Sequence, residues 1–103
     1  MIDVGIATLP NQALSIQLDE RFYEIELREA NGVMSASIVR DGVTLVSNIR
    51  VTAGTPLLPY RYQEAGNFIM TADGEAIPYW DQFNVTQFLV YLSADELAAY
   101  RGA

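Results

Sequence analysis

Two-residue turn signals divide this chain into short segments, and they constrain its fold more than any other feature. The dipeptides Asn31-Gly32, Asp41-Gly42 and Asp73-Gly74 each lie between segments rich in β-branched or aromatic residues. Asn-Gly and Asp-Gly favour the type I′ turn, in which both central residues have positive φ, and this turn joins neighbouring antiparallel strands. The sequence therefore predicts a β-hairpin at each of these three places.

The segments around the turns alternate with a period of two, which is typical of half-buried strands. Tyr23, Ile25 and Leu27, for example, alternate with charged residues, and every second residue between 14 and 18 is leucine or isoleucine. One face of each strand is thus apolar and the other polar. The predicted strands span residues 4–8, 13–18, 21–30, 33–40, 43–51, 67–72 and 84–92, and the four from 13 to 51 form a meander.

The end of the chain changes from a strand pattern to a helix pattern. Ser93 and Glu96 have the spacing of a capping box, and Leu92 and Leu97 occupy the two positions of a hydrophobic staple. These signals predict a short helix from residue 94 to about residue 101. Leu97 and Tyr100 are expected on its inner face.

Together these elements predict an all-β fold, an antiparallel β-barrel or sandwich of about six to seven strands with a short C-terminal helix. Its 103 residues are expected to form one domain, residues 1–103, because a chain of this length buries roughly 65% of its unfolded surface. Strand 84–92 is apolar on both faces near its end, which favours a central strand whose second face is covered by the helix or by another subunit.

Composition excludes several classes of chemistry. The chain has no cysteine and no histidine, so disulfides, thiol nucleophiles and the usual zinc ligands are absent. Its formal charge is −7, and none of its six arginines lies beside another, so we expect neither direct nucleic-acid binding nor binding to an anionic membrane. No apolar run approaches the roughly 20 residues of a membrane span, and no basic signal-peptide region is present.

Closely spaced carboxylates are candidate catalytic or metal-binding groups. Glu24 and Glu26 are two residues apart on one strand face, roughly 6.5 Å, a separation that glycosidases use. An ordinary solvated face is favoured, because nothing raises the pKa of one carboxyl above that of the other. Asp41-Gly42 and Asp73-Gly74 lack the distal glutamate of a calcium loop and indicate turns instead. We therefore expect no enzyme, and no catalytic, cofactor-binding or metal-binding residues.

Several segments, in their order along the chain, resemble a known family. They are Leu9-Pro10-Asn11-Gln12 with the alternating strands after it, the stretch Leu45–Tyr62, Gly66-Asn67-Phe68-Ile69-Met70 and Leu89-Val90-Tyr91-Leu92. In this order they are similar to the small baseplate plug proteins of contractile-tailed bacteriophages. The resemblance implies a structural protein of the virion, at the distal end of the tail tube beside the hub and spike.

The resemblance also carries expectations about location and partners. It implies a protein made in the host cytoplasm and located in the tail baseplate, in several copies within a symmetric assembly, with the hub, tail-tube and spike proteins as partners. The alternative is a free-standing β-barrel module that holds a small apolar or carbohydrate ligand between Trp80 and the tyrosines.

Two segments are predicted to contact partners. Residues 52–59 cannot form a central strand, because Pro56 and Pro59 lack the N–H that a ladder needs, so they form a crossover or an arm whose leucines cover a sheet edge or dock on a neighbour. The loop 78–83 concentrates three aromatic residues without a strand period. The predicted interface comprises Pro56, Leu57, Leu58, Pro59, Tyr60, Arg61, Tyr62, Tyr79, Trp80 and Phe83.

The acidic charge has two interpretations. A protein that lines or closes a tube for DNA must not hold phosphate, which predicts acidic or neutral residues facing the channel, with Glu24, Glu26, Asp73 and Glu75 exposed. Alternatively, the charge only keeps an assembly subunit soluble before it meets its partners.

Overall fold

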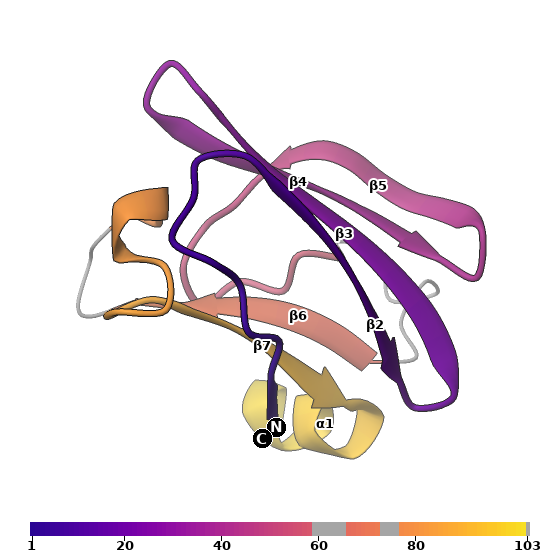
Figure 1. Cartoon of the computed structure of the whole chain (residues 1–103). Helices are drawn as coiled ribbons and strands as arrows, with labels where there is room; N and C mark the ends of the chain where they lie inside the picture. The colour runs from indigo at the N-terminus through magenta and orange to yellow at the C-terminus, as the bar shows by residue number, and fades with distance from the viewer. Residues whose placement is uncertain (59–65, 73–76, 103) are drawn as a thin grey trace.

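The chain folds into two antiparallel sheets packed face to face, as the computed structural model shows for residues 1–58, 66–72 and 77–102 (Figure 1). The meander sheet has the order β2 (Gln12–Leu18), β3 (Arg21–Ala30), β4 (Val33–Arg40), β5 (Val43–Arg50). The terminal sheet has the order β1 (Ile2–Asp3), β7 (Phe88–Ser93), β6 (Gly66–Thr71), and α1 (Ala94–Gly102) follows β7. The predicted all-β class is confirmed as a sandwich, since the strands of the described residues form two separate sheets and do not close into a barrel.

The turns of the meander sheet follow the predicted chemistry. Asn31-Gly32 and Asp41-Gly42 both have positive φ at their two central residues, so each joins adjacent strands as a two-residue turn. Asp19-Glu20 makes the same kind of turn between β2 and β3, with φ of 49° and 63°, although it contains no glycine. The hairpin predicted at Asp73-Gly74 lies outside the described residues.

The strand predicted at residues 4–8 is wrong. Only Ile2 and Asp3 pair with β7, and the Val4 N–H still donates to the Leu89 carbonyl at 2.8 Å. Gly5 then has φ of 79°, a left-handed conformation that turns the chain away from β7 toward the meander sheet. Ile6 is buried after this turn, so the apolar pattern of the segment reflects burial without strand pairing.

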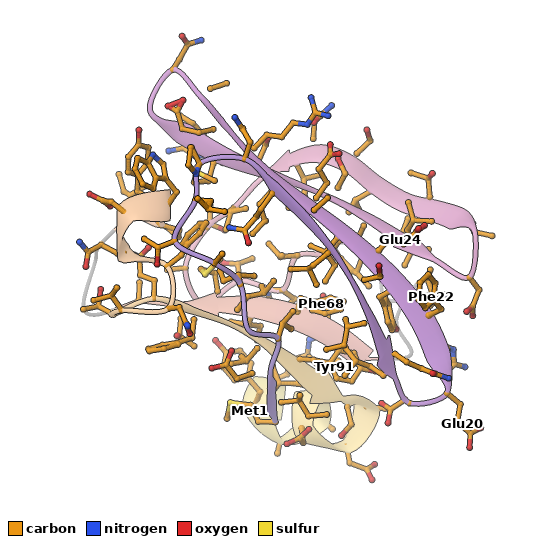
Figure 2. All side chains as sticks on the ribbon, in the orientation of Figure 1. Met1, Glu20, Phe22, Glu24, Phe68 and Tyr91 are labelled. Atoms are coloured by element: carbon orange, nitrogen blue, oxygen red, sulfur yellow. The ribbon has the colours of Figure 1, made fainter. Side chains whose placement is uncertain are left out.

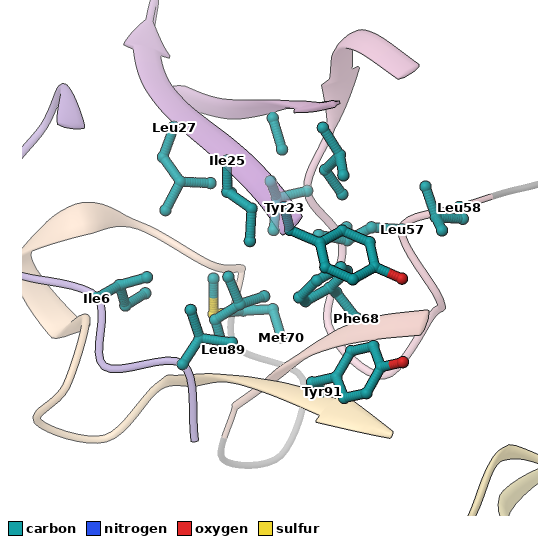
Figure 3. Packing of buried hydrophobic residues seen from close by; sticks show 14 of the residues in the cluster. Ile6, Tyr23, Ile25, Leu27, Leu57, Leu58, Phe68, Met70, Leu89 and Tyr91 are labelled. Carbon is teal, nitrogen blue, oxygen red and sulfur yellow. The ribbon is translucent and has the colours of Figure 1, made fainter. Parts of the chain in front are cut away.

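The core between the sheets is built around three aromatic rings, one from each of three strands. Tyr23 and Phe68 meet edge to face with ring centroids 5.2 Å apart, and Phe68 and Tyr91 are also 5.2 Å apart (Figure 3). Aromatic pairs at this distance stabilise by about 0.5–1.5 kcal/mol beyond their burial. Because Tyr23 comes from β3 while the other two come from β6 and β7, this cluster joins the two sheets.

The outer face of the terminal sheet has its own apolar cluster. Ile69, Val90, Leu92 and Leu97 are buried together there, with Phe88 packed against them. Leu97 belongs to α1, so the helix is the second cover that the two-faced apolar pattern of β7 predicted. Tyr100 is not on the inner face as expected, because half of its surface is exposed while its hydroxyl donates to the Gly54 carbonyl at 2.6 Å.

The capping box at the start of α1 is confirmed. The Ser93 N–H donates to Glu96 Oε1 at 3.0 Å, and the Glu96 N–H donates to Ser93 Oγ at 3.4 Å. The second oxygen of Glu96 accepts a hydrogen bond from the amine of Met1, so this carboxylate also holds the chain beside β7.

Ser93→Ala is expected to lower the free energy of unfolding by about 1 kcal/mol, because the Glu96 N–H loses its cap. Urea unfolding followed by circular dichroism measures this difference. Ser47→Ala is the matched control, since Ser47 lies exposed on β5 and its loss should change the stability by less than about 0.5 kcal/mol. Equal effects of the two substitutions would contradict a capping role for Ser93.

Candidate partner interface

Residues 77–87, which precede β7, are organised by one buried amide side chain. Gln87 is almost fully buried, and its Oε1 accepts the Tyr79 N–H at 2.9 Å while its Nε2 donates to the Ile77 carbonyl at 3.3 Å. A buried amide that bonds backbone groups on both sides fixes their positions relative to the strand that follows. The single helical turn η2 (Trp80–Gln82) lies inside the loop held in this way.

A tight turn replaces the first part of the strand predicted at 84–92. The N–H groups of Val85, Thr86 and Gln87 all donate to the Gln82 carbonyl at 3.0–3.1 Å, and Asn84 has φ of 61°. Ladder pairing therefore begins only at Phe88. The prediction of a strand is wrong for residues 84–87, because these residues satisfy their backbone hydrogen bonds within a turn. Apolar alternation in the sequence does not distinguish such a turn from a strand.

Two further contacts attach this loop to the rest of the sandwich. Thr8 Oγ1 donates to the Phe83 carbonyl at 2.6 Å, and the Tyr79 hydroxyl donates to Glu29 Oε2 at 3.1 Å. The donor of the first bond lies in the N-terminal segment, and the acceptor of the second lies near the end of β3. The loop is thus fixed to the N-terminal segment and to the meander sheet at one end of the molecule, where Figure 1 shows it in orange.

Apolar side chains are left on the surface at this end. Ile77 is 63% exposed, Val85 61% and Leu9 51%, and they accompany the half-buried Tyr79 and Trp80, whose ring centroids are 6.0 Å apart. We call this set of five residues the aromatic end. Exposed apolar and aromatic side chains concentrated on one loop and on the segment bonded to it are typical of surfaces that contact another protein.

The crossover residues of the predicted interface lie inside the molecule instead. Leu57 is 3% exposed and Leu58 1%, and both belong to the core between the sheets. The Gly54 N–H donates to the Met70 carbonyl and the Leu57 N–H to the Phe68 carbonyl, so the crossover covers the free edge of β6. Of the two roles predicted for these leucines, the structure shows the covering of a sheet edge.

The other predicted interface residues divide into four groups. Phe83 is fully buried in the core, Pro56 is partly buried beside Leu57, and Tyr79 and Trp80 lie at the surface of the aromatic end. Pro59, Tyr60, Arg61 and Tyr62 lie outside the described residues. Leu9, Ile77 and Val85 were not among the predicted interface residues. Leu9 and Ile77 are apolar residues outside the predicted strands, and Val85 lies within the strand predicted at 84–92.

Carboxylates on the outer face of the meander sheet form an ordinary solvated surface. Glu24 is exposed, and Glu26 accepts a hydrogen bond from Arg28 Nε at 2.6 Å, which raises the pKa of Arg28. Asp73 and Glu75, the other two acids predicted to be exposed, lie outside the described residues. Within the described ranges no three metal-binding side chains come together, and no helix is long and apolar enough to cross a membrane.

One buried tyrosine has an altered acidity, but it serves the core. Burial, together with the 2.7 Å hydrogen bond from its hydroxyl to Asp19 Oδ2, raises the pKa of Tyr91 well above its ordinary value. A more weakly acidic phenol stays protonated and remains a donor at neutral pH. Tyr91 therefore ties the turn between β2 and β3 to the terminal sheet.

These features define a small two-sheet β-sandwich protein with a rigid apolar loop at one end. Its sequence assigns it further: the family model described as Cyanophage baseplate Pam3 plug gp18 matches residues 1–95, and the chain belongs to this family. The resemblance to baseplate plug proteins is thereby confirmed, as is a location in the virion tail baseplate. No curated protein matches the chain.

Proposed function

We propose that this protein is a non-enzymatic structural component of the tail baseplate, which plugs the distal tail tube or adapts it to the hub and spike through protein contacts. The observation that carries the proposal is an exposed, rigidly held aromatic end on a chain of the baseplate plug family. Several copies in a symmetric assembly would present this end repeatedly around the tube axis.

Rigidity supports a docking role for the aromatic end. Its backbone is held by Gln87, its rim by the bonds from Thr8 and Tyr79, and Phe83 anchors it in the core. A surface that is already ordered loses little conformational entropy on binding, so more of the contact energy appears as affinity. Tyrosine and tryptophan are also the residue types that most often carry binding energy at interfaces.

The charge of the molecule is compatible with a place beside the DNA path. A formal charge of −7 repels the phosphate backbone, an effect that salt screens beyond about 8 Å at physiological ionic strength. The exposed Glu24 and the partly exposed Glu26 place negative charge on the outer face of the meander sheet. The small-ligand alternative would need a barrel interior, whereas side chains fill the space between the two sheets (Figure 3).

Trp80→Ala is expected to reduce incorporation of the protein into virions by roughly tenfold or more, the loss expected when a hot-spot aromatic is truncated. Quantitative mass spectrometry of purified virions, with the tube protein as reference, measures the incorporation. The fold should remain cooperative, since Trp80 is only partly buried. Thermal unfolding of the isolated variant checks this.

Val43→Ala is the control, because it truncates an exposed apolar side chain, 62% exposed, at the opposite end of the meander sheet. If Trp80→Ala is incorporated into virions at the wild-type level, the aromatic end is not part of the proposed interface. Absence of the wild-type protein from purified virions would reject the baseplate role itself.

A further inference from the structure

The four outer strands of the two sheets differ in how their edges are protected. The edge of β6 is covered by the crossover through the bonds of Gly54 and Leu57, and β1 has only two residues. The edge strand β5 is bent by a bulge, where Asn48 has φ of 52° and donates its N–H to Ser37 Oγ. Covering, shortening and bulging are the usual devices that prevent a sheet edge from pairing with another chain.

Strand β2 has none of these protections. It is seven residues long, contains no proline, glycine or charged residue, and runs in unbroken register with β3 from Gln12 to Leu18. Among the described residues no backbone group bonds to its outer side. An edge of this kind is a template for one more strand.

The direction of the free backbone groups follows from neighbouring hydrogen bonds. Phe22 uses its N–H and C=O toward β4, where they meet the side chain and the N–H of Asp41. Its partner across β2, Gln17, therefore points its own N–H and C=O away from β3. With a period of two, Ala13 and Ser15 do the same, so three N–H and three C=O groups face outward.

The two faces beside this edge have different chemistry. On the inner face Leu14 and Ile16 are only partly buried against the core, so an added strand with apolar side chains would cover them. On the outer face Ala13 and Ser15 are small, and Glu24 lies next to Ser15 on β3 (Figure 2). These residues line a hollow of about 510 Å³ that extends over β3 and β4.

We infer that the edge of β2 binds an extended segment of another protein as an added antiparallel strand, with apolar side chains on the inner face and arginine or lysine side chains on the outer face. A long basic side chain can lie across Ala13 and Ser15 and reach the Glu24 carboxylate, which has no ion pair among the described residues. Antiparallel addition continues the pattern of the meander sheet and is the more stable arrangement.

A second copy of this chain suits the edge less well. Its β2 would present only alanine, serine and glutamine beside the acidic hollow, and each copy carries a formal charge of −7. Such pairing would leave Glu24 without a positive partner. The edge of β2 shares no residue with the aromatic end, so binding at this edge can be tested separately from the proposed function.

The test uses a short labelled peptide of alternating arginine and valine, with blocked termini, and fluorescence anisotropy with the intact protein. In antiparallel pairing the residues whose side chains lie on the outer face direct their N–H groups at β2. N-methylation at the arginine positions is therefore expected to weaken binding by about tenfold or more, while N-methylation at the valine positions leaves it nearly unchanged. Both modified peptides keep the same charge.

Variants of the protein provide the matching comparison. Ser15→Pro removes an outward N–H without touching the ladder to β3, and proline is tolerated at such edge positions, so affinity should fall about tenfold with the fold retained. Glu24→Gln should weaken binding a few fold and reduce its dependence on salt. Trp80→Ala should leave peptide affinity unchanged, which separates this surface from the aromatic end.

Three results would overturn the inference. They are no binding of the unmodified peptide, equal weakening by the two methylation patterns, and a dimer of the isolated protein that Ser15→Pro abolishes. If Ser15→Pro does not fold, the methylated peptides with the wild-type chain still decide between these outcomes.

Discussion

Asn67→Leu is expected to lower the free energy of unfolding by about 2–6 kcal/mol, the largest effect of any substitution considered for this protein. Asn67 is fully buried, its Oδ1 accepts the Leu58 N–H at 2.9 Å, and its Nδ2 donates to the Leu58 carbonyl at 2.9 Å. Leucine has a similar size but no polar atoms. Two buried backbone groups of the crossover would lose their partners, at about 1–3 kcal/mol each. Urea unfolding at neutral pH measures the difference.

Met70→Leu is the matched control, because it places the same side chain at another fully buried position of β6. A volume-conserving apolar exchange of this kind costs less than about 1.5 kcal/mol. If Asn67→Leu were no more harmful than Met70→Leu, the amide would not be what holds the crossover on the edge of β6. Its conservative replacement Asn67→Asp should also be harmful, since it removes the donor to Leu58.

Gly66→Ala is expected to lower the free energy of unfolding by about 3 kcal/mol, the upper end of what overpacking usually costs. A Cβ at residue 66 would lie 2.1 Å from the Tyr91 hydroxyl oxygen and 2.6 Å from the Leu92 carbonyl oxygen. The tyrosine ring could move only by leaving its hydrogen bond with Asp19, and the Leu92 carbonyl belongs to the neighbouring strand. The same urea titration measures the effect.

Two comparisons isolate the cause of this effect. Gly32→Ala meets open space and suffers only from its φ of 78°, so it should cost about 1–2 kcal/mol. In a Tyr91→Leu background the ring contact is gone, and the additional cost of Gly66→Ala should shrink in a double-mutant cycle. An unchanged cost there would assign the whole effect to the contact with the Leu92 carbonyl.

The elements that were predicted correctly depend on short-range chemistry. The turns at Asn31-Gly32 and Asp41-Gly42 need positive φ, which these residue pairs tolerate, and the cap of α1 needs only Ser93 and Glu96 at the right spacing. The alternation of β3 likewise placed Tyr23, Ile25 and Leu27 correctly in the core. In each case the conformation is determined by residues a few positions apart in the sequence, or by the alternation along a single strand.

The elements that were missed depend on contacts between distant segments. The sequence of residues 4–8 contains no signal for the turn at Gly5, because this turn depends on the position of β7 beside Val4. In the sequence Gln87 resembles an ordinary polar residue of a strand. In the structure its buried side chain bonds to the backbone of Ile77 and Tyr79 and thereby orders the loop 77–87. The Asp19-Glu20 turn has no glycine, and the strands on both sides impose its positive φ.

The residues of the proposed partner interface show the same division. Aromatic density in residues 78–83 pointed to a surface loop, and Tyr79 and Trp80 do lie at the aromatic end. The sequence was compatible with Leu57 and Leu58 in an arm or in a cover of a sheet edge. Backbone hydrogen bonds of Gly54 and Leu57 to β6 hold this segment on the sheet edge, and both leucines are buried. Leu9 follows Thr8, whose hydroxyl donates to the Phe83 carbonyl and so attaches the N-terminal segment to the loop that carries Ile77 and Val85.

By itself the sequence determined the all-β class, the meander and the capped C-terminal helix, because these depend on the backbone preferences of neighbouring residues and on alternation with a period of two. Membership in the baseplate plug family also follows from the sequence, through the order of its similar segments. The tertiary structure decided which apolar residues are core and which are surface, and which sheet edge is free. Those outcomes depend on what each segment packs against, since an apolar side chain or an unpaired N–H is satisfied by any suitable neighbour. Only the folded chain determines that Leu58 is buried in the core, while the aromatic end is exposed and β2 is an edge strand.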